Sequence, residues 1–450
     1  METPHSGSAR TDSSTETLRT SPLETLNLSI SDRSSTVGVV GLGYVGLPLL
    51  VAISEAEFPV IGVDSDPEKV ANLLDGESYV PDVTNTDLAV ARRAVFTSRP
   101  SALAEADVIL ITVPTPLTDG VPDLTLVKRA CADVAGVLRP GQLVILESTT
   151  YPGTTEEVVR PLLEESGLVA GRDFGLAYSP ERIDPGGSWG LKETPKIVSG
   201  IGPLDTDLAA LFYGQFVDQV VTTPTPREAE MAKLIENTFR HVNIALVNEL
   251  ATVAPDLGVD LWAALDAAAT KPFGYMPFWP GPGVGGHCIA IDPNYLSWRV
   301  GQRLGFGIGF IERAKEINNR MPAYVAARIG EALNDHGKPI WGSRVMAIGV
   351  PYKAGVNDVR ESPAIDVLEH LICRGAIASY HDDFVPEVPV AGRVLRSEPL
   401  DADVLAAQDC VAILTAHPQI DYEFVVRHAH LVFDARGVTR HLRALNRVLL

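Results

Sequence analysis

The chain has 450 residues, and 46% of them are hydrophobic, so it can bury a large core and divide into two or three domains. Its formal net charge of −20 comes from an excess of Asp and Glu, and no basic stripe could neutralise a phosphate backbone, which excludes nucleic-acid-binding proteins. No run of about 18 apolar residues occurs, and the polar N-terminal segment lacks the apolar core of a secretory signal. We therefore expect a cytoplasmic protein with no membrane partner.

The four cysteines, Cys131, Cys288, Cys373 and Cys410, are too few and too scattered for a disulfide scaffold. No two of them have metal-ligand spacing, so the sequence predicts no metal site. We expect Cys131, Cys373 and Cys410, each within an apolar segment, to be buried and inert.

In chain order, the first predicted element is a disordered tail over residues 1–35, which is rich in Ser, Thr, Asp and Glu. We expect the tail to be removable to about residue 33 without loss of turnover. A strand at 36–40, a turn and helix starting at GLGYVGLPL, and a second strand in VIGVDSD then form a βαβ unit. Further strands in ADVILITVP and QLVILEST extend it, and residues 36–222 are predicted to form a doubly wound parallel sheet.

A long helix follows, because residues 226 to about 257 contain no internal Gly and only one late Pro. It is expected to bridge two domains and to belong to a helical region at 223–336, which includes a Gly/Pro-rich loop at 280–293. Strands in RVMAIGV, IASYHDD, DCVAILTAH and HLVFDARG then predict a second α/β domain over 337–450. The fold class is α/β, with two Rossmann-like doubly wound parallel sheets joined by a long central helix.

The glycines Gly41, Gly43 and Gly46 follow the first strand and open the first helix, where backbone N–H groups can approach a pyrophosphate. Asp64 ends the second strand, where a carboxylate can bind ribose hydroxyls and repels a 2′-phosphate. Asp66, two residues later, is the alternative ribose ligand. This arrangement predicts NAD rather than NADP.

The loop PGPGVGGHC places Cys288 among glycines and prolines, four residues before Asp292. A Gly-rich turn at a helix N-terminus offers N–H dipoles that favour the thiolate, so Cys288 is a candidate nucleophile. On the long helix, Lys233 and Asn237 are four residues apart and share one face. That pair alone is a weak signal, because a lysine on an acidic helix is usually solvated.

Seven ordered segments resemble the UDP-glucose/GDP-mannose dehydrogenase family: GLGYVGLPL, VPTPL, ESTTYPGTT, SPER, EAEMAKLIENTFR, GPGVGGHCIAIDP and YKAGVNDVRESPA. The resemblance covers about residues 36–445. It implies an NAD-binding domain, a central helical dimerisation region and a C-terminal domain that holds a UDP-sugar. It also implies two successive oxidations, from alcohol to aldehyde and then, through a cysteine thiohemiacetal and thioester, to the acid, in a homodimer or a higher homo-oligomer.

The resemblance carries roles over to single residues. The matched catalytic residues are Cys288, Lys233, Asn237, Asp292, Thr149 and Glu181. The matched cofactor contacts are Gly41, Gly43, Tyr44, Val45, Gly46, Asp64, Thr115 and Thr149. The predicted substrate contacts are Glu181, Arg182, Lys233, Asn237, Lys353 and Arg360.

These roles have a physical basis. Lys233 would stabilise the oxyanion of the cysteine adduct, while Asn237 and Asp292 would position a water that relays the alcohol proton. Glu181 would assist thioester hydrolysis, with Thr149 orienting the water.

Two departures distinguish the chain from the UDP-glucose branch of this family. It has SPERIDPG where that branch has SPEFLREG, with Arg182 in place of a phenylalanine and Pro185 in place of a second glutamate, and it has His287 before the cysteine in place of a serine. Both features resemble the branch that acts on 2-acetamido sugars, UDP-N-acetylglucosamine or UDP-N-acetylmannosamine. A UDP-glucose substrate stays the alternative.

In the C-terminal domain, the family places sugar and phosphate contacts in YKAGVNDVRESP, which contains Lys353, Asp358, Arg360, Glu361 and Ser362. Arg360 is the best candidate for substrate charge, because a guanidinium matches phosphate oxygens bidentately. The alternative is a structural pair with Asp358 or Asp366. The aromatic residues Phe273 and Tyr275 could equally be core residues and are left out of the site.

Two rival functions remain open at this stage. One is a related dehydrogenase that stops after a single hydride transfer and needs no cysteine. The other is a catalytically silent protein that binds nucleotide sugars. The Gly-rich loop around Cys288 argues against the first, and the intact set of matched catalytic residues argues against the second.

Overall fold

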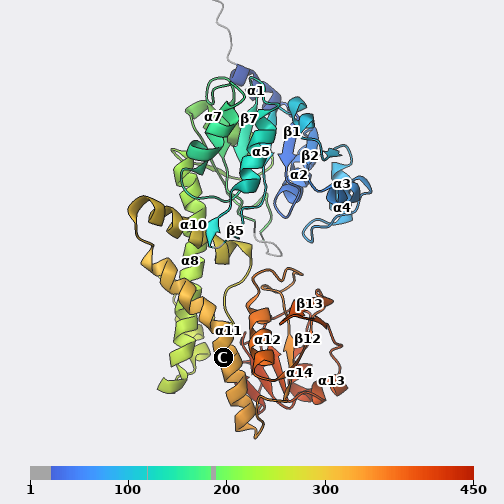
Figure 1. Cartoon of the computed structure of the whole chain (residues 1–450), viewed down its shortest axis with the longest axis vertical. Coiled ribbons are helices and arrows are strands. Elements are labelled where there is room, and N and C mark those ends of the chain that lie inside the picture. Colours follow the sequence, from blue (N-terminus) through green and yellow to red (C-terminus); the bar gives the residue numbers. More distant parts are fainter. Residues whose placement is uncertain (1–21, 119, 184–188) are drawn as a thin grey trace, which may run out of the picture.

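The computed structural model describes residues 22–118, 120–183 and 189–450, without the side chains of Pro22, His287 and Cys288. Two sheet-containing lobes lie one above the other, and long helices run along one side of both (Figure 1). The first lobe has an eight-stranded sheet with the order β10-β9-β8-β7-β4-β1-β2-β3. In that order the strands are Val220–Thr222, Lys196–Gly200, Gly175–Tyr178, Leu143–Leu146, Val108–Ile111, Val37–Val40, Val60–Val63 and Val95–Thr97.

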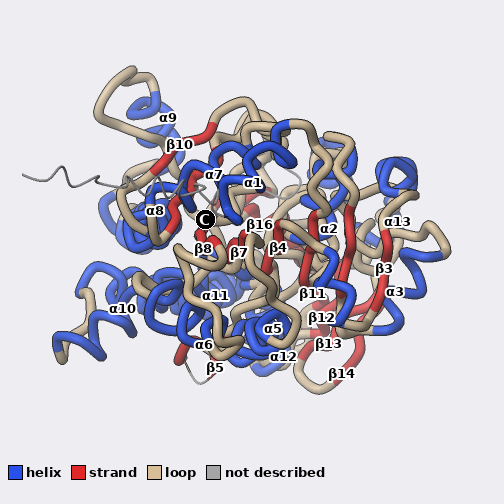
Figure 2. The backbone as a smooth tube through the Cα atoms, turned by 90° about the horizontal axis from the view of Figure 1, so that it is seen from above, coloured by secondary structure: helices blue, strands red, loops and turns tan. Residues whose placement is uncertain are grey.

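The central strands β1, β2, β4, β7 and β8 are fully buried apolar runs, as a parallel sheet covered on both faces requires. Helices cover both faces of this sheet (Figure 2). They are α1 (Pro22–Ser31), α2 (Gly46–Glu55), α3 (Pro67–Leu74), α4 (Asn85–Leu88), α5 (Thr125–Ala135), α6 (Arg160–Glu164) and α7 (Pro203–Tyr213). Here the βαβ prediction is confirmed.

The edge of the sheet departs from the all-parallel prediction. Strand β8 pairs with β9 antiparallel, and β9 pairs with β10 in parallel, so the last two strands run against the rest. A parallel pairing needs a crossover, usually a helix, and the described part of the connection from β8 to β9 contains none.

The prediction of a disordered tail over residues 1–35 is wrong for its second half. Residues 22–31 form α1, and Leu23, Leu26 and Ile30 are buried in the same core cluster as Leu208 of α7. These three residues recur at helical spacing, so they make one apolar face that repays the cost of ordering the segment. Residues 1–21 lie outside the described part of the chain.

The helical middle of the chain starts with α8 (Pro226–Val253), which confirms the long helix. Thr225 caps its N-terminus in a capping box with Glu228, and Pro226 occupies the first turn, where a missing N–H costs nothing. Three helices follow: α9 (Leu261–Ala269), α10 (His287–Leu304) and α11 (Gly309–Asp335). Both α10 and α11 pack on α8.

The Gly/Pro-rich loop is shorter than predicted. It ends at Gly286, and α10 begins at His287, so Cys288 and Asp292 lie in the first turns of a helix. Gly286 has φ 82°, a conformation that favours glycine and turns the chain into the helix.

The second sheet has the order β12-β11-β15-β16-β17, all parallel. Its strands are Ile377–His381, Arg344–Ile348, Cys410–Ile413, Val432–Asp434 and Arg447–Leu449. Its helices are α12 (Pro363–Cys373), α13 (Ala402–Ala406) and α14 (Tyr422–His428), and two hairpins complete the fold: β5 (Leu117–Thr118) with β6 (Val121–Pro122), and β13 (Glu387–Val390) with β14 (Arg393–Arg396).

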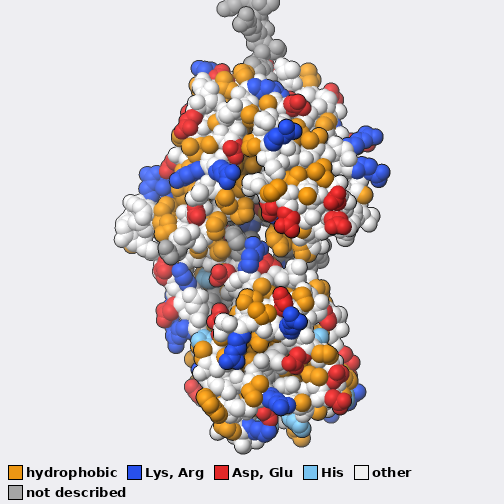
Figure 3. All heavy atoms as spheres, turned by 45° about the vertical axis from the view of Figure 1, so that its right-hand side comes forward, with side chains coloured by type: hydrophobic (Ala, Val, Ile, Leu, Met, Phe, Trp, Pro, Cys, Tyr) orange, Lys and Arg blue, Asp and Glu red, His pale blue; other side chains and the backbone are white. Residues whose placement is uncertain are grey.

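Both sheets reverse their strand order once, between β1 and β4 in the first and between β11 and β15 in the second. Open α/β sheets bind ligands at such reversals, beyond the carboxyl ends of the strands. The surface is hollowed between the two lobes (Figure 3). The boundaries of the domains at residues 222 and 336 stay predictions.

Candidate active site

The loop after β1 has the geometry of a dinucleotide site. Gly41 has φ +92°, and a Cβ on Gly46 would lie 1.9 Å from Gly41 O and 2.5 Å from Thr112 Oγ1. No side chain fits at Gly46, whereas a Cβ at Gly43 would meet nothing within 4 Å. The loop is therefore closely packed on the sheet and open above Gly43, which fits a pyrophosphate lying on the start of α2.

Asp64 and Asp66 have different surroundings. Asp64 Oδ2 accepts a 2.8 Å hydrogen bond from Leu42 N–H in the glycine loop, and its Oδ1 accepts from Asp66 N–H. The side chain of Asp66 accepts from Glu68 N–H and caps α3. Asp64 is thus joined to the dinucleotide loop, which favours it over Asp66, although its contact with a ribose stays a prediction.

Thr115 and Thr149 lie close together beyond the ends of β4 and β7. Thr115 Oγ1 donates a 2.8 Å hydrogen bond to Thr149 O, and the phenol of Tyr295 on α10 donates to Thr115 O. The helix that carries Cys288 is therefore attached to the loop that would lie beside the cofactor.

The polar centre lies between α8 and α10. Lys233, Asn237 and Asp292 are all buried, and Asn237 Nδ2 donates a 2.5 Å hydrogen bond to Asp292 Oδ2. Burial raises the pKa of Asp292 to about 6, while the charge of Lys233 and the bond from Asn237 oppose this rise. The structure thus brings Lys233, Asn237 and Asp292 together, and the pKa of the carboxyl group is about 6.

Glu181 and Arg182 follow β8 and turn different ways. Glu181 Oε1 accepts a hydrogen bond from Ile183 N–H, and the buried Oε2 has no hydrogen-bond partner among the described residues. Arg182 pairs with Glu236 of α8 at 2.7 Å and donates to Pro195 O. Pro185 lies outside the described residues.

Cys288 is the second residue of α10, and its side chain lies outside the described part of the structure. The glycines before it are packed against the second lobe: a Cβ on Gly285 would lie 2.4 Å from Glu361 O, and one on Gly286 would lie 2.6 Å from the ring of Tyr352. Glycine is therefore needed here for close approach, and the cysteine loop touches the loop that follows β11.

The loop after β11 carries Lys353 and Arg360. Arg360 pairs bidentately with Asp358, with Nε–Oδ1 at 2.9 Å and Nη2–Oδ2 at 2.6 Å, so the structural pair left open above is present. Its guanidinium also lies 5.1 Å from the ring centre of Tyr44. Arg360 thus joins the second lobe to the dinucleotide loop.

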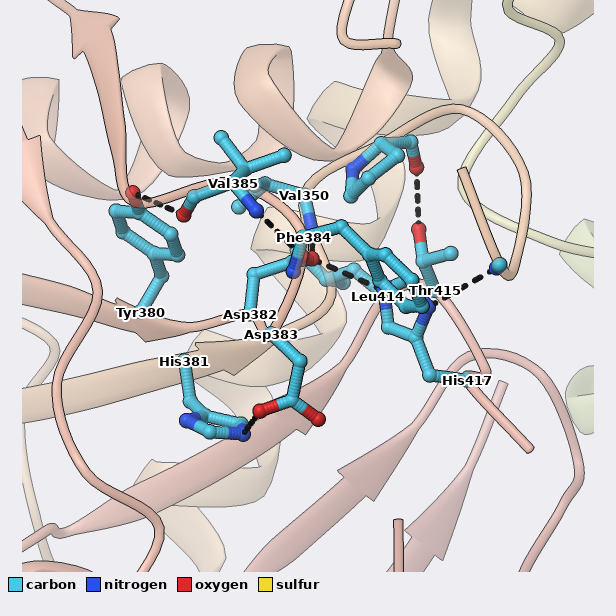
Figure 4. A network of polar contacts seen from close by, with 12 residues as sticks. Val350, Tyr380, His381, Asp382, Asp383, Phe384, Val385, Leu414, Thr415 and His417 are labelled. Carbon is cyan, nitrogen blue, oxygen red and sulfur yellow. Dashed lines mark hydrogen bonds and ion pairs between the residues drawn. The ribbon is translucent and has the colours of Figure 1, made fainter. Parts of the chain in front are cut away.

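A buried network supports this loop (Figure 4). His417, after β15, contacts Asp382 at 2.9 Å through Nε2, and its Nδ1 accepts from Gly355 N–H. Burial raises the pKa of Asp382, but hydrogen bonds from His417 and from the N–H groups of Val350 and Phe384 outweigh burial and leave the pKa below its usual value. These hydrogen bonds anchor the loop after β11 at the point where the strand order of the second sheet reverses.

The sequence analysis did not select His417, Asp382 or Arg436. Arg436 follows β16, donates to Leu414 O through Nε, and lies so near Gly281 that a Cβ there would be 2.8 Å from Nη1. It follows a predicted strand, in HLVFDARG, and a cation after the carboxyl end of a strand could have marked it.

The other cysteines differ. Cys131 and Cys410 are buried, and burial raises the pKa of each thiol to about 12, so both fit the prediction. The prediction is wrong for Cys373, which is exposed because it is the last residue of α12. Phe273 and Tyr275 are exposed as well and are not core residues.

Together, the glycine loop, the reversal of strand order in each sheet and the buried polar centre between them define a two-lobed α/β dehydrogenase. Family models match residues 35–210 as the NAD binding domain, 227–320 as the central domain and 346–441 as the UDP binding domain of the UDP-glucose/GDP-mannose dehydrogenase family. The chain belongs to this family.

Relatives that are named as nucleotide-sugar dehydrogenases agree with this assignment. A UDP-N-acetyl-D-glucosamine 6-dehydrogenase of Pseudomonas aeruginosa is 38% identical over 74% of this chain and 79% of its own. A UDP-N-acetyl-D-mannosamine dehydrogenase of Escherichia coli K12 is 33% identical over 90% and 99%. The solved UDP-D-ManNAc dehydrogenase of Pyrococcus horikoshii superposes with a TM-score of 0.82 at 32% identity, over 92% of this chain and 98% of that one.

The protein is thus an NAD-dependent oxidoreductase that acts on a CH–OH group, and it carries a UDP-binding domain. The prediction of NAD as cofactor is confirmed at the level of the family. Within the described residues, no helix is both long enough and apolar enough to cross a bilayer.

Proposed function

We propose that the protein oxidises the C6 alcohol of a UDP-2-acetamido sugar, UDP-N-acetylglucosamine or UDP-N-acetylmannosamine, to a carboxylate. The observation that carries the proposal is the buried cluster of Lys233, Asn237 and Asp292 beside the first turn of the helix that bears Cys288. A single hydride transfer needs only a base, whereas a base and a cysteine on the same helix suit two oxidations.

In the first oxidation, the chain must remove the alcohol proton. Asp292 is ionised above a pH of about 6 and can accept that proton through a water that Asn237 helps to hold. NAD, when bound, accepts a hydride from C6 in each of the two oxidations. The glycine loop and Asp64 would place it, with Thr115 and Thr149 beside its reactive end.

In the second oxidation, the sulfur of Cys288 forms a bond to the aldehyde carbon, and the ammonium of Lys233 stabilises the resulting oxyanion. The first turn of α10 favours the thiolate, because its unpaired N–H groups carry partial positive charge. Hydride loss then leaves a thioester. Water attacks the thioester carbon, gives its proton to Glu181, and the C–S bond breaks with its electron pair returning to sulfur.

For the substrate, the 2-acetamido assignment is supported by Arg182 and His287 and by relatives whose names specify N-acetylated sugars. Lys353 and Arg360 would bind the substrate from the second lobe. Arg360 uses Nε and Nη2 for Asp358, so its Nη1 is the group that would reach a ligand oxygen.

Replacement of Cys288 tests the proposal. We expect Cys288→Ala to form no acid from any nucleotide sugar, while Cys373→Ala, a matched loss of an exposed thiol, keeps full turnover. UDP-N-acetylglucosamine, UDP-N-acetylmannosamine and UDP-glucose are compared in the same assay. A fully active Cys288→Ala enzyme contradicts the covalent mechanism, and a wild-type protein that binds these sugars without turnover supports the silent binding protein.

We also propose that the protein is a homodimer formed through α8. Five exposed apolar side chains fall within about 60° on this helix, on the side opposite Lys233 and Asn237. They are Ile235, Phe239, Leu246, Leu250 and Val253. A second copy would cover this stripe.

Leu246→Glu tests the dimer, because a buried charge at the centre of the stripe would oppose pairing. We expect the variant to have half the wild-type mass in light scattering. The dimer is contradicted by a wild-type monomer or by an unchanged mass of the variant.

A further inference from the structure

A buried ammonium lies behind the candidate site and has no place in the chemistry described so far. Lys196, the first residue of β9, is 3% exposed. Its Nζ contacts Glu147 Oε2 at 2.7 Å and Glu181 Oε2 at 3.8 Å. Glu147 directly follows β7, and Glu181 belongs to the candidate site, so this lysine joins a structural carboxylate to a functional one.

The hydrogen bonds of the cluster are unequal. Glu147 has both oxygens satisfied, because Tyr213 donates to Oε1 and Lys196 to Oε2. Glu181 accepts only from Ile183 N–H, and its Oε2 faces the ammonium at 3.8 Å without a hydrogen bond from a described residue. Among the described oxygens of Glu147 and Glu181, Oε2 of Glu181 is therefore the one left for a water or a substrate atom.

The charges of the cluster explain why the ammonium is needed. Two carboxyl groups and one ammonium lie together as buried side chains, and a buried carboxylate without a cation is strongly disfavoured. Burial raises the pKa of Glu147, and Lys196 opposes this rise. The ring of Tyr213 lies 5.1 Å from Nζ, and burial raises the pKa of this phenol far above its usual value, so it stays a hydrogen-bond donor.

The other charged neighbour cannot replace the lysine. Arg182 is next to Glu181 in sequence, but its guanidinium is paired with Glu236 on α8. Within the described part of the chain, the cation that contacts Glu181 is Lys196.

We infer that Lys196 is a positioning residue that holds the carboxylate of Glu181 with Oε2 open to the attacking water, and that Glu147 and Tyr213 hold Lys196 in place. This inference rests on the proposed function, in which Glu181 accepts the proton of that water. It predicts that loss of the lysine slows thioester hydrolysis because Glu181 is affected, and not because the protein is less stably folded.

The test is a cycle of Lys196→Met, Glu181→Gln and the double variant, with Lys192→Met as the matched loss of an exposed lysine before the same strand. The readout is the rate of acid formation against pH. We expect Lys196→Met to move the acidic limb of this profile above the wild-type limb near pH 6, which Asp292 sets, because the charge that favours the carboxylate of Glu181 is lost. The double variant should be no slower than Glu181→Gln, and Lys192→Met should match wild type.

The outcomes separate the two proposals. If the wild type forms no acid, the proposed function fails. If the wild type forms acid but Lys196→Met keeps the wild-type profile, or if the losses of Lys196→Met and Glu181→Gln multiply in the double variant, the inference fails. Should Lys196→Met not fold, Lys196→Met with Glu147→Gln removes both buried charges, and an unshifted limb in that variant equally overturns the inference.

Discussion

The amide of Asn237 donates a 2.5 Å hydrogen bond to Asp292, and this bond connects the long helix α8 to α10, the helix whose second residue is the candidate nucleophile. Both side chains are buried. Burial raises the pKa of Asp292 to about 6, which places its ionisation inside the range where the enzyme would work.

The first prediction concerns Asp292→Asn. Only the ionised carboxylate accepts a proton, so wild-type turnover should rise as pH increases through about 6. The variant should lose about 100-fold or more in kcat and should lack this limb. Rates of NADH formation on either side of this pH test it, with the exposed Asp256→Asn as control. A variant that keeps the limb would show that another group titrates.

The second prediction compares two glycines of one loop. Gly46→Ala should abolish NAD binding, because its Cβ would overlap Gly41 O. Gly43→Ala has room for its methyl group and should fold normally, yet bind NAD more weakly because that methyl group occupies the space left for the pyrophosphate. Calorimetric titration with NAD measures both, and equal affinities for the two variants would refute the assigned position of the cofactor.

The third prediction concerns α1. Leu26 is buried and Leu28 is 69% exposed on the same helix. Leu26→Ala should lower the free energy of unfolding by about 2–5 kcal/mol, and Leu28→Ala should leave it nearly unchanged. Deletion to residue 33 removes α1 and should likewise destabilise the protein. This prediction replaces the expectation from composition that the tail can be removed to that residue without loss of turnover. Chemical denaturation measures the free energy of unfolding of each variant. Equal values for Leu26→Ala and Leu28→Ala would count against the packing of α1.

The fourth prediction concerns the pH dependence of stability. Burial raises the pKa of Asp205 in α7 to about 7, while N–H groups of Gly202 and Leu176 oppose the rise. Because the folded state favours the protonated form, this group's contribution to stability is present at low pH and is lost as pH rises from about 4 to about 7.

Asp205→Asn cannot ionise, so its stability relative to wild type should improve across that interval. Asp207→Asn, an exposed loss of charge on the same helix, should show no such trend. Denaturation midpoints at several pH values supply the comparison, and parallel curves for Asp205→Asn and wild type would contradict the assignment.

Local patterns predicted much of this structure. The glycine loop, the strand that ends at Asp64 and the capped helix α8 each depend on residues close in sequence, and their geometry agrees with the prediction. The pairing of Lys233 and Asn237 was predictable from helical periodicity, because residues four apart share a face.

What the sequence did not reveal depends on distant partners. Lys196 looks like any strand-flanking lysine, since Glu147 is 49 residues away in sequence. The contact of Arg360 with Tyr44 joins two lobes and has no local signature. The helix α1 was missed because its three apolar residues lie within a Ser- and Thr-rich segment, where overall composition outweighed a short helical pattern.

The central claim is a four-electron oxidation, and the most direct measurement is the molar ratio of NADH formed to sugar consumed with purified protein, NAD and UDP-N-acetylglucosamine, and with UDP-N-acetylmannosamine and UDP-glucose in parallel. We predict two NADH per sugar and a uronic acid product from a 2-acetamido substrate. One NADH per sugar with an aldehyde product would contradict the account and remove Cys288 from its assigned role.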